Sequence, residues 1–415
     1  MIVMQEIKQI LFVTLLFTSC INEDDSLINN QVEINSSNNF YKVSLAEADK
    51  YANDILDDLA GTTSTLSVKR KLVIAEYKVL SHKTRSSFSD LPDTVLYLLN
   101  YDKGFALLGA DKRLARIYAI SNEGELHFSD TTFNKPLAIV LNGINENIIN
   151  TLIAANSPYS KPLRILPDGY EAKLVLYKKV DPILWPYVRT WSQDAPYNKY
   201  CFTADGVQAV AGCSPLAIAQ IMSYYSWPQT IGNTYLPWRS MKKKGADDKI
   251  ATLIRYLGNA DLLNSQYGIK ETVTKLNAQK RTFEALGYNC DEYTTYFDPY
   301  YAIQWLSGTL ESNLNQRGPV LMYGLSSGKS TGHNWVIDGY LLNDIYTRRA
   351  GSTDESAWVK YAHDFELFHC VWGWGGKSNG YYCFSSKYAF SGKPIFTGVP
   401  DDNDRDIVCN YSAPL

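Results

Sequence analysis

The spacing of hydrophobic residues divides the chain into two expected domains, and the first of them lies within residues 40–157. Residues 44–56 carry apolar side chains at helical intervals, and Ser44 with Glu47 forms a capping-box sequence at their start. Strand-like runs and a second helix-like stretch at residues 136–156 come next. The strand-like runs cover residues 71–80, 95–100, 104–108 and 114–120. This order of helix, strands and helix predicts a small α+β domain.

A proline-rich and basic stretch, residues 158–182, follows and predicts the boundary between the domains. It holds four prolines and five lysine or arginine residues, with at most a short strand at residues 172–177. Such a stretch is typical of an accessible loop that proteases cut. All nine tryptophans lie at Trp185 or later, so the composition changes here as well. The second domain is therefore expected over residues 183–415.

A buried helix is predicted directly after Cys213, in the second domain. Apolar residues recur from Leu216 to Met222, and a Trp-Pro pair ends the pattern. Gly212 permits a sharp turn before the cysteine. A thiol at a helix N-terminus meets unsatisfied N–H groups, which lower its pKa and favour the thiolate. Cys213 is therefore a candidate nucleophile, and a buried structural cysteine is the alternative.

A thiolate nucleophile needs a basic partner, and five histidines are available. His82 and His127 belong to the first domain. His333 follows a glycine and opens a strand-like run, so it can face a cleft, and it is the preferred partner. His363, in a polar insertion, and His369, just before a Trp-Gly-Trp segment, are weaker candidates. Each of them can instead be a structural imidazole.

The N-terminus predicts export. Lys8 precedes an apolar run at residues 10–17, and two small residues and Cys20 follow it. This pattern is typical of a signal peptide over residues 1–20, and it resembles a bacterial lipobox with Cys20 as the lipidated residue. Residues 21–39 are polar and predict a flexible tether. We therefore expect an outer-membrane or cell-surface lipoprotein that processing can release, with ordinary secretion as the alternative.

Composition and cysteine spacing narrow the partners further. A net charge of -3 and a pI near 6.0 give no general attraction for nucleic acid, so no nucleic-acid partner is expected. The same balance leaves the lipid anchor as the expected contact with a membrane. The seven cysteines form no CxxC pair, and nothing in the sequence indicates a metal site or a cofactor. With Cys20 and Cys213 set aside five cysteines are left, an odd number that argues against a disulfide framework.

Four segments together resemble the streptopain family of secreted, papain-like bacterial cysteine proteases. They are Ala211-Gly-Cys213 with the helix behind it, Gly332-His333 with the following strand, Trp372-Gly-Trp-Gly-Gly376, and residues 190–198. Residues 98–124 of the first domain are similar to the inhibitory propeptide of that family. The resemblance therefore implies a papain-like α+β catalytic domain that a small α+β propeptide domain precedes.

The resemblance also implies a role for individual residues. Cys213 would be the nucleophile, His333 the general acid and base, Gln193 the side-chain donor of the oxyanion hole, and Trp372 the residue that orients His333. Trp374, Gly332 and Asn334 would line the substrate cleft. Asn334 stands where the family has small residues, and Val371 stands where an asparagine is common. Neither departure removes the Cys213–His333 pair.

A further departure is the stretch 341–368, which is longer and more charged than the usual link between these segments. The sequence indicates an exposed insertion near the cleft. It could cap the substrate groove or dock a partner, and a solvated loop is the commoner outcome.

The expected function is therefore a secreted or surface-anchored cysteine endopeptidase made as a zymogen, which cleaves proteins or peptides through a thioester intermediate. The propeptide would act as an intramolecular inhibitor until the chain is cut between about residues 157 and 182. Two alternatives stay open. One is a cell-wall peptidase or amidase with the same Cys-His chemistry, and the other is a surface-binding protein that has lost activity.

Overall fold

The computed structural model describes residues 41–61, 70–79, 92–132, 134–155, 168–275, 278–294, 299–325, 332–383, 391–398 and 410–412. The expected signal peptide and tether, with Cys20, lie outside these residues, and so does His82. We call residues 41–155 the N-terminal region and residues 168–415 the C-terminal region.

The N-terminal region begins with the predicted amphipathic helix, α1 (Leu45–Leu59). The hydroxyl of Ser44 accepts a hydrogen bond from the main-chain N–H of Glu47 at 3.1 Å, which confirms the predicted helix start. The helix buries Ala48, Ala52 and Ile55 against the sheet of this region. The elements that follow are β1 (Leu72–Val79), β2 (Thr94–Tyr101), β3 (Phe105–Gly109), β4 (Ile117–Ser121), the 3-10 helix η1 (Phe128–Thr132) and α3 (Lys135–Ala155). Helix, strands and helix therefore occur in the predicted order.

The C-terminal region contributes the remaining helices and strands. None of the helices described in either region is both long and apolar enough to cross a membrane. The helices are α4 (Pro186–Arg189), α5 (Cys213–Tyr225), α6 (Trp238–Met241), α7 (Asp247–Leu257), α8 (Ala278–Ala285), α9 (Pro299–Gln316) and the 3-10 helix η2 (Glu355–Ala357). The strands are β5 (Tyr170–Val180), β6 (Thr230–Ile231), β7 (Thr234–Tyr235), β8 (Asn289–Thr294), β9 (Val320–Leu325), β10 (Gly332–Arg349), β11 (Val359–Val371), β12 (Gly380–Cys383), β13 (Ser391–Gly398) and β14 (Asn410–Ser412).

One sheet continues from the N-terminal region into the C-terminal region. Its order is β1-β2-β3-β4-β12-β11-β10-β9-β13-β8-β14, and β5 pairs with β10 beside this path. The link is the antiparallel pairing of β4 with β12, in which Ile120 lies opposite Tyr381. The two expected domains therefore share a sheet, and the domain boundaries remain predictions.

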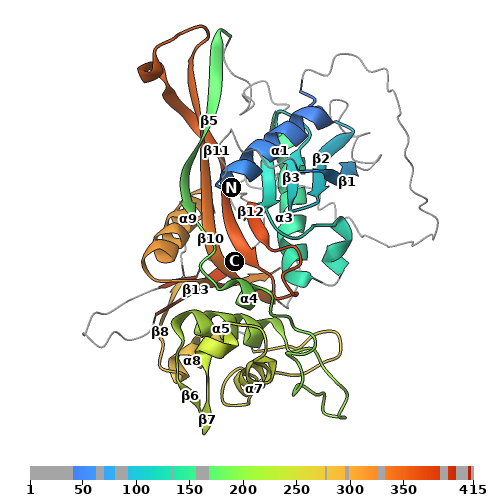
Figure 1. Ribbon diagram of the computed structural model, residues 1–415, viewed down its shortest axis with the longest axis vertical. Coiled ribbons are helices and arrows are strands. Elements are labelled where there is room, and N and C mark those ends of the chain that lie inside the picture. Colours follow the sequence, from blue (N-terminus) through green and yellow to red (C-terminus); the bar gives the residue numbers. More distant parts are fainter. Residues whose placement is uncertain are drawn as a thin grey trace, which may run out of the picture. The chain divides into compact units, whose positions relative to one another are not determined.

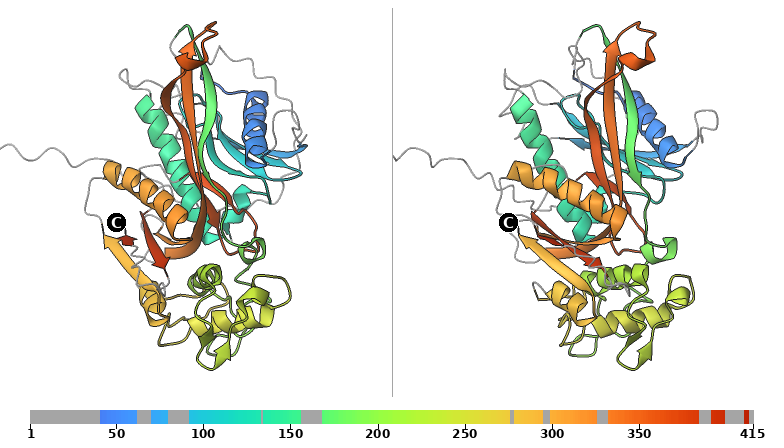
Figure 2. Two further views of the ribbon diagram at one scale, coloured as in Figure 1. Left: turned by 60° about the vertical axis from the view of Figure 1, so that its left-hand side comes forward. Right: turned by 90° about the vertical axis from the view of Figure 1, so that its left-hand side faces the viewer.

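The strands β9 and β10 alternate between two hydrophobic clusters, as a sheet covered on both faces must. Trp335 and Ile337 of β10 pack in the cluster that contains the core of α1 and α3 and part of α9. Val336, between them, packs in the cluster that contains α5 and α7. Figure 2 shows α3 and α9 beside these strands and α5 below them. This alternation decides which cluster each neighbour of His333 faces.

The insertion at residues 341–368 is a long β-hairpin, so the solvated-loop alternative is wrong. The far half of β10 pairs with β11 on one side, from Leu341 opposite Leu367 to Thr347 opposite Val359. On its other side it pairs with β5, up to Arg349 opposite Tyr170. We call this three-stranded unit, residues 170–180, 341–349 and 359–367, the arm (Figure 1). β5 is longer than the expected strand at residues 172–177, because β10 supplies a continuous partner.

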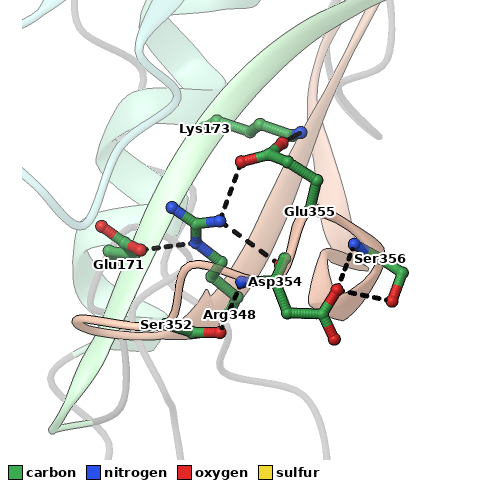
Figure 3. A network of polar contacts seen from close by, with 7 residues as sticks. All are labelled: Glu171, Lys173, Arg348, Ser352, Asp354, Glu355 and Ser356. Carbon is green, nitrogen blue, oxygen red and sulfur yellow. Dashed lines mark hydrogen bonds and ion pairs between the residues drawn. The ribbon is translucent and has the colours of Figure 1, made fainter.

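The arm ends in a network of polar contacts near the surface (Figure 3). The guanidinium of Arg348 donates to Glu171 at 2.6 Å and to Glu355 at 3.0 Å. It also lies 4.4 Å from the centre of the Trp358 ring, which Lys173 approaches at 4.5 Å. Exposed ion pairs of this kind contribute little to stability, because water already solvates both charges.

The arm also contacts the N-terminal region. The carboxylate of Asp364 on β11 is buried and accepts hydrogen bonds from the Tyr51 hydroxyl and, at 3.4 Å, from the Asn343 amide. It also forms an ion pair with Arg116 at 3.2 Å. Leu341 and Phe365 of the arm lie in the same hydrophobic cluster as α1. The insertion therefore packs against the N-terminal region rather than standing free.

Candidate active site

Cys213 is the first residue of α5, as the sequence predicts. Gly212 precedes the helix with φ of +94°, a conformation that residues with a side chain rarely adopt. A Cβ atom on Gly212 would also lie 3.0 Å from the side chain of Thr272. Every residue of the helix from Ser214 to Ser223 is buried, so its position is fixed by packing. The thiol therefore sits at a rigid helix N-terminus, where the first N–H groups have no partner within the helix.

His333 faces this thiol from the start of β10. Its Nδ1 atom lies 3.9 Å from Sγ of Cys213. Gly332, just before it, packs against Tyr323 so closely that a Cβ atom would lie 2.3 Å from the tyrosine ring. The glycine is therefore required by close packing where the strand carries the imidazole to the helix end.

Gln193 reaches the same place from the segment before α5. Its main-chain N–H donates to the carbonyl oxygen of Gly373 at 3.2 Å, and its own carbonyl oxygen accepts from Ala211 N–H at 2.8 Å. The residue is buried. These two bonds tie the glutamine to both the Trp-Gly-Trp segment and the turn before Cys213.

The three residues line one cavity of about 130 Å³. Gly332, Asn334 and Trp374, which the resemblance assigns to the cleft, line it too. Two lining residues come from the N-terminal region, namely Lys135 and Pro136 at the start of α3. The other lining residues are Ser214, Lys270, Glu271, Thr272, Val273, Thr274, Gln279 and Tyr323. The start of α3 therefore shares the cavity that holds the candidate nucleophile.

Trp372 occupies a different place from the other predicted site residues. It is buried and is not among the residues that line this cavity. Its indole N–H donates to the carbonyl oxygen of Ser378 at 2.8 Å, and its ring packs against Trp335 and Tyr382. An effect on His333 would therefore pass through packing, with Trp335 two residues further along β10. The orienting role of Trp372 stays a prediction.

The other histidines lie away from the thiol as far as the structure describes them. His369 is buried, and its Nδ1 atom lies 2.5 Å from the carboxylate of Asp338. Nε2 of His127 lies 3.6 Å from the carboxylate of Glu125. His363 is a residue of β11 opposite Asp344, and its side chain is outside the description. The structural interpretation therefore fits His369 and His127.

Burial sets the protonation of the pair in this state. It raises the pKa of the Cys213 thiol, although the N–H of Asn334 at 3.4 Å from Sγ acts in the opposite direction. Burial, and secondly the positive charge of Lys135, lower the pKa of His333 to about 4. Both shifts favour the neutral thiol and the neutral imidazole near pH 7, and the charge of Lys135 at the start of α3 adds to the shift of His333.

The other described cysteines take no part in this cavity. Cys201 and Cys370 are free and buried, and Cys290 and Cys383 are buried as well. The described residues also contain no group of three or more histidine, cysteine and acidic side chains that could hold a metal ion.

Several residues of this site carry no signal in the sequence. Lys135 and Pro136 belong to another region and carry no motif. Ser214 and Gln279, which lie beside Cys213, are polar residues whose partners are distant in sequence. The helical pattern behind Cys213 is the one feature that predicts burial of Ser214.

The chain is similar to known cysteine peptidases. Residues 191–382 match the Peptidase C10 family. The thiol protease/hemagglutinin PrtT of Porphyromonas gingivalis is 24% identical over 311 residues, which are 67% of this chain and 32% of PrtT. Streptopain of Streptococcus pyogenes is 22% identical over 334 residues, 71% of this chain and 74% of streptopain. The chain thus spans about a third of PrtT and three quarters of streptopain.

The fold agrees with these matches. A prointerpain A fragment from Prevotella intermedia superposes with a TM-score of 0.52 at 19% identity, covering 78% of this chain and 98% of the fragment. The predicted α+β, papain-like fold is therefore confirmed. Residues 191–382 match a Peptidase C10 domain, and the similarities to streptopain and to PrtT together support a streptopain-like cysteine peptidase.

Proposed function

We propose that the chain is a cysteine endopeptidase made as a zymogen, with proteins or peptides as its substrates. The observation that carries this proposal is the 3.9 Å approach of Cys213 Sγ to His333 Nδ1 in a cavity that Gln193 also lines. A nucleophile, a proton carrier and an amide donor in one cavity are what acyl transfer requires. The similarity to PrtT, a thiol protease, and to streptopain supports the same activity.

The chemistry would run in two halves. The Cys213 thiolate attacks the scissile carbonyl carbon, and the main-chain N–H of Cys213 and the Gln193 amide stabilise the resulting oxyanion. Protonated His333 gives its proton to the leaving amine, and the C–N bond breaks to leave a thioester. His333 then accepts a proton from water as the water attacks the thioester. The acid product leaves, and the thiolate and imidazolium are restored.

The N-terminal region would be the inhibitor. Lys135 and Pro136 line the cavity, and burial with the charge of Lys135 keeps His333 neutral near pH 7. The likeness of the fold to prointerpain A, a pro-form, supports the same interpretation. Activation would then follow a cut between the regions. We place that cut before Tyr170, because β5 is paired with β10 along its length and a paired strand does not enter a protease cleft.

Export and lipid anchoring are part of the proposal and rest on residues 8–20 of the sequence. Metabolic labelling with a radioactive fatty acid should mark the wild-type chain in a bacterial host and leave Cys20→Ala unmarked. Label on both proteins, or on neither, would contradict lipidation at Cys20.

The activity is tested by covalent labelling and by substrate degradation. An epoxide inhibitor of cysteine peptidases should modify the processed protein but not Cys213→Ala, and casein should be degraded only by the former. Degradation of peptidoglycan in place of casein would favour the cell-wall alternative. Absence of labelling after processing would favour the inactive binding protein.

A further inference from the structure

A buried polar cluster lies between the segment that carries Cys213 and the segment that carries His333. At its centre is the amide of Asn334, which is 2% exposed. Its Oδ1 atom accepts from the Ser214 hydroxyl at 2.7 Å and from the Gln279 amide at 3.1 Å. Its Nδ2 atom donates to the carbonyl oxygen of Met322 at 3.0 Å. The amide is thus bonded to three separate segments of the chain.

The cluster is directly adjacent to both members of the reacting pair. Ser214 follows Cys213 at the start of α5, and Asn334 follows His333 at the start of β10. The side chains of successive strand residues point to opposite faces. The Asn334 amide therefore meets Ser214 of α5, whereas the His333 ring lies in the cavity that Cys213 and the start of α3 share. The Ser214 hydroxyl also lies 2.9 Å from the hydroxyl of Thr274. Hydrogen bonds on the α5 side therefore hold the strand that presents the imidazole.

The main chain of Asn334 has a contact of its own with the nucleophile. Its N–H donates to Sγ of Cys213 at 3.4 Å. A hydrogen bond to a sulfur atom favours the thiolate, because the negative charge strengthens it. The bond depends on the direction of a single peptide plane, and the bonds of the Asn334 side chain fix that plane. A fully satisfied buried network of this kind specifies one arrangement, since breaking any bond leaves a buried polar group unpaired.

We propose that Asn334, held by Ser214 and Gln279, is a positioning residue that aims its main-chain N–H at Cys213 and sets the distance between the thiol and His333. The proposal rests on the proposed function of Cys213 as the nucleophile. It gives a role to the two polar residues that follow the nucleophile and the histidine in sequence. Substrate is not touched by the Asn334 side chain in this role, because its polar atoms are already bonded within the protein.

The experiment measures the ionisation of Cys213 by its reaction with iodoacetamide across pH, on the full chain. Mass spectrometry of the peptide that contains Cys213 excludes signals from other cysteines, and Cys213→Ala is the blank. In Asn334→Ala we expect the rate at pH 7 to fall about tenfold and the pKa from the profile to rise by about one unit, the equivalent of one lost hydrogen bond to a charge. Ser214→Ala should shift both values in the same direction by a smaller amount.

Matched controls separate positioning from stability. Asn313→Ala removes another buried amide, which donates to the carbonyl oxygen of Gly318 just before β9. Ser223→Ala removes a buried hydroxyl from the same helix as Ser214. Each control should lower the melting temperature as much as the test variant that it matches, Asn334→Ala or Ser214→Ala. The alkylation rates of both controls should stay within twofold of wild type across the pH range.

The outcomes are distinct. A profile of Asn334→Ala that superposes on wild type, or controls that slow alkylation equally, would overturn the proposal. If Asn334→Ala does not fold, the comparison of Ser214→Ala with Ser223→Ala decides the question by itself. The readout needs no peptide hydrolysis, so a wild-type chain that is alkylated but cleaves no protein would contradict the proposed function and leave this proposal intact. After processing, kcat for a peptide should fall in Asn334→Ala while KM changes less than twofold.

Discussion

The two halves of β10 belong to one strand but are stabilised in different ways. The near half, residues 332–340, is covered on both faces, and its start presents His333 to the nucleophile. The far half, residues 341–349, lies between β5 and β11 and ends at the exposed network around Arg348. Chemistry is confined to the near half, where buried polar contacts hold single atoms in place. The far half instead extends the sheet, and the arm that it forms contacts the N-terminal region.

This difference predicts that changes near His333 affect rate, whereas changes in the arm affect how firmly the N-terminal region is held. The reason is physical. A buried hydrogen bond to a reacting group changes ionisation and geometry together, whereas an exposed ion pair is screened by water and salt. Five substitutions test the contrast, and their expected effects decrease in the order given.

His333→Ala should lower kcat of the processed protein by about 10⁴-fold, because it removes the imidazole that transfers protons beside Cys213. Steady-state hydrolysis of a peptide measures it. His369→Gln is the control, since that imidazole is bound to buried Asp338 and should affect stability rather than rate. Equal losses of kcat in the two variants would contradict the assignment of His333.

Gln193→Ala should reduce kcat by about 100-fold with little change in KM, as expected when one oxyanion donor is lost. The matched control is Gln220→Ala, another buried glutamine amide, which bonds to Val188. A fall in kcat confined to Gln193→Ala supports the oxyanion role, and a fall in both would point to a general loss of folding.

Asp364→Asn should destabilise the full chain by about 2 kcal/mol, because the variant removes the charge that buried contacts with Arg116 and Tyr51 require. Urea denaturation measures the free energy of unfolding. Asp354→Asn makes the same chemical change in the exposed turn of the arm and should leave the midpoint nearly unchanged. An equal loss of unfolding free energy in both variants would show that the buried contacts of Asp364 stabilise the chain no more than the exposed turn at Asp354.

Lys135→Ala should reduce the loss of stability that the full chain suffers when the pH is lowered. The pKa of His333 is about 4 when folded and near 6.5 when unfolded, so the folded state loses stability as pH falls from 6.5 towards 4. Removing the Lys135 charge raises the folded pKa, by less than the full gap because burial is the larger cause. Thermal unfolding at pH 7.5 and 4.5 should show a smaller difference in the variant than in wild type or in Lys103→Ala, which changes an exposed lysine.

Arg348→Met should have the smallest effect, with a melting temperature within about 2 °C of wild type and no change in kcat. The Arg348 contact to Glu355 is solvent-exposed and the contact to Glu171 is partly buried, and methionine can still cover the Trp358 ring. A larger fall in melting temperature would show that the network at the tip does stabilise the arm. In that case 0.5 M salt, which screens the ion pairs of the wild type, should remove the difference between the wild type and the variant.

The sequence was most informative where local pattern and chemistry coincide. The helix behind Cys213, the capping box at Ser44 and the strand after His333 follow from spacing and turn residues, and all three lie where they were expected. The family resemblance added Gln193, which spacing alone would not have singled out. These features depend on contacts within a few residues or on recognisable segments.

The features that could not be predicted depend on contacts between distant segments. Asn334 was expected only as part of the cleft, and its bonds to Ser214 and Gln279 join residues 120 and 55 positions apart. Polar residues at 341–368 suggested a solvated loop. The hairpin found there pairs with β5 and packs against α1, and it cannot be recognised from its own residues without these distant partners. Trp372 has an indole N–H that is bonded to Ser378, a partner that no pattern indicates.

The pairing of β4 with β12 has a consequence for the molecule after a cut between the regions. While the regions stay together, β12 is an inner strand and its tyrosines 381 and 382 are buried. Departure of the N-terminal region would turn β12 into an open sheet edge, with unpaired backbone groups beside newly wetted aromatic rings. Release of the peptidase would thus leave it with an exposed strand that can pair with other chains. Rearrangement of the chain or pairing with another strand must then cover this edge.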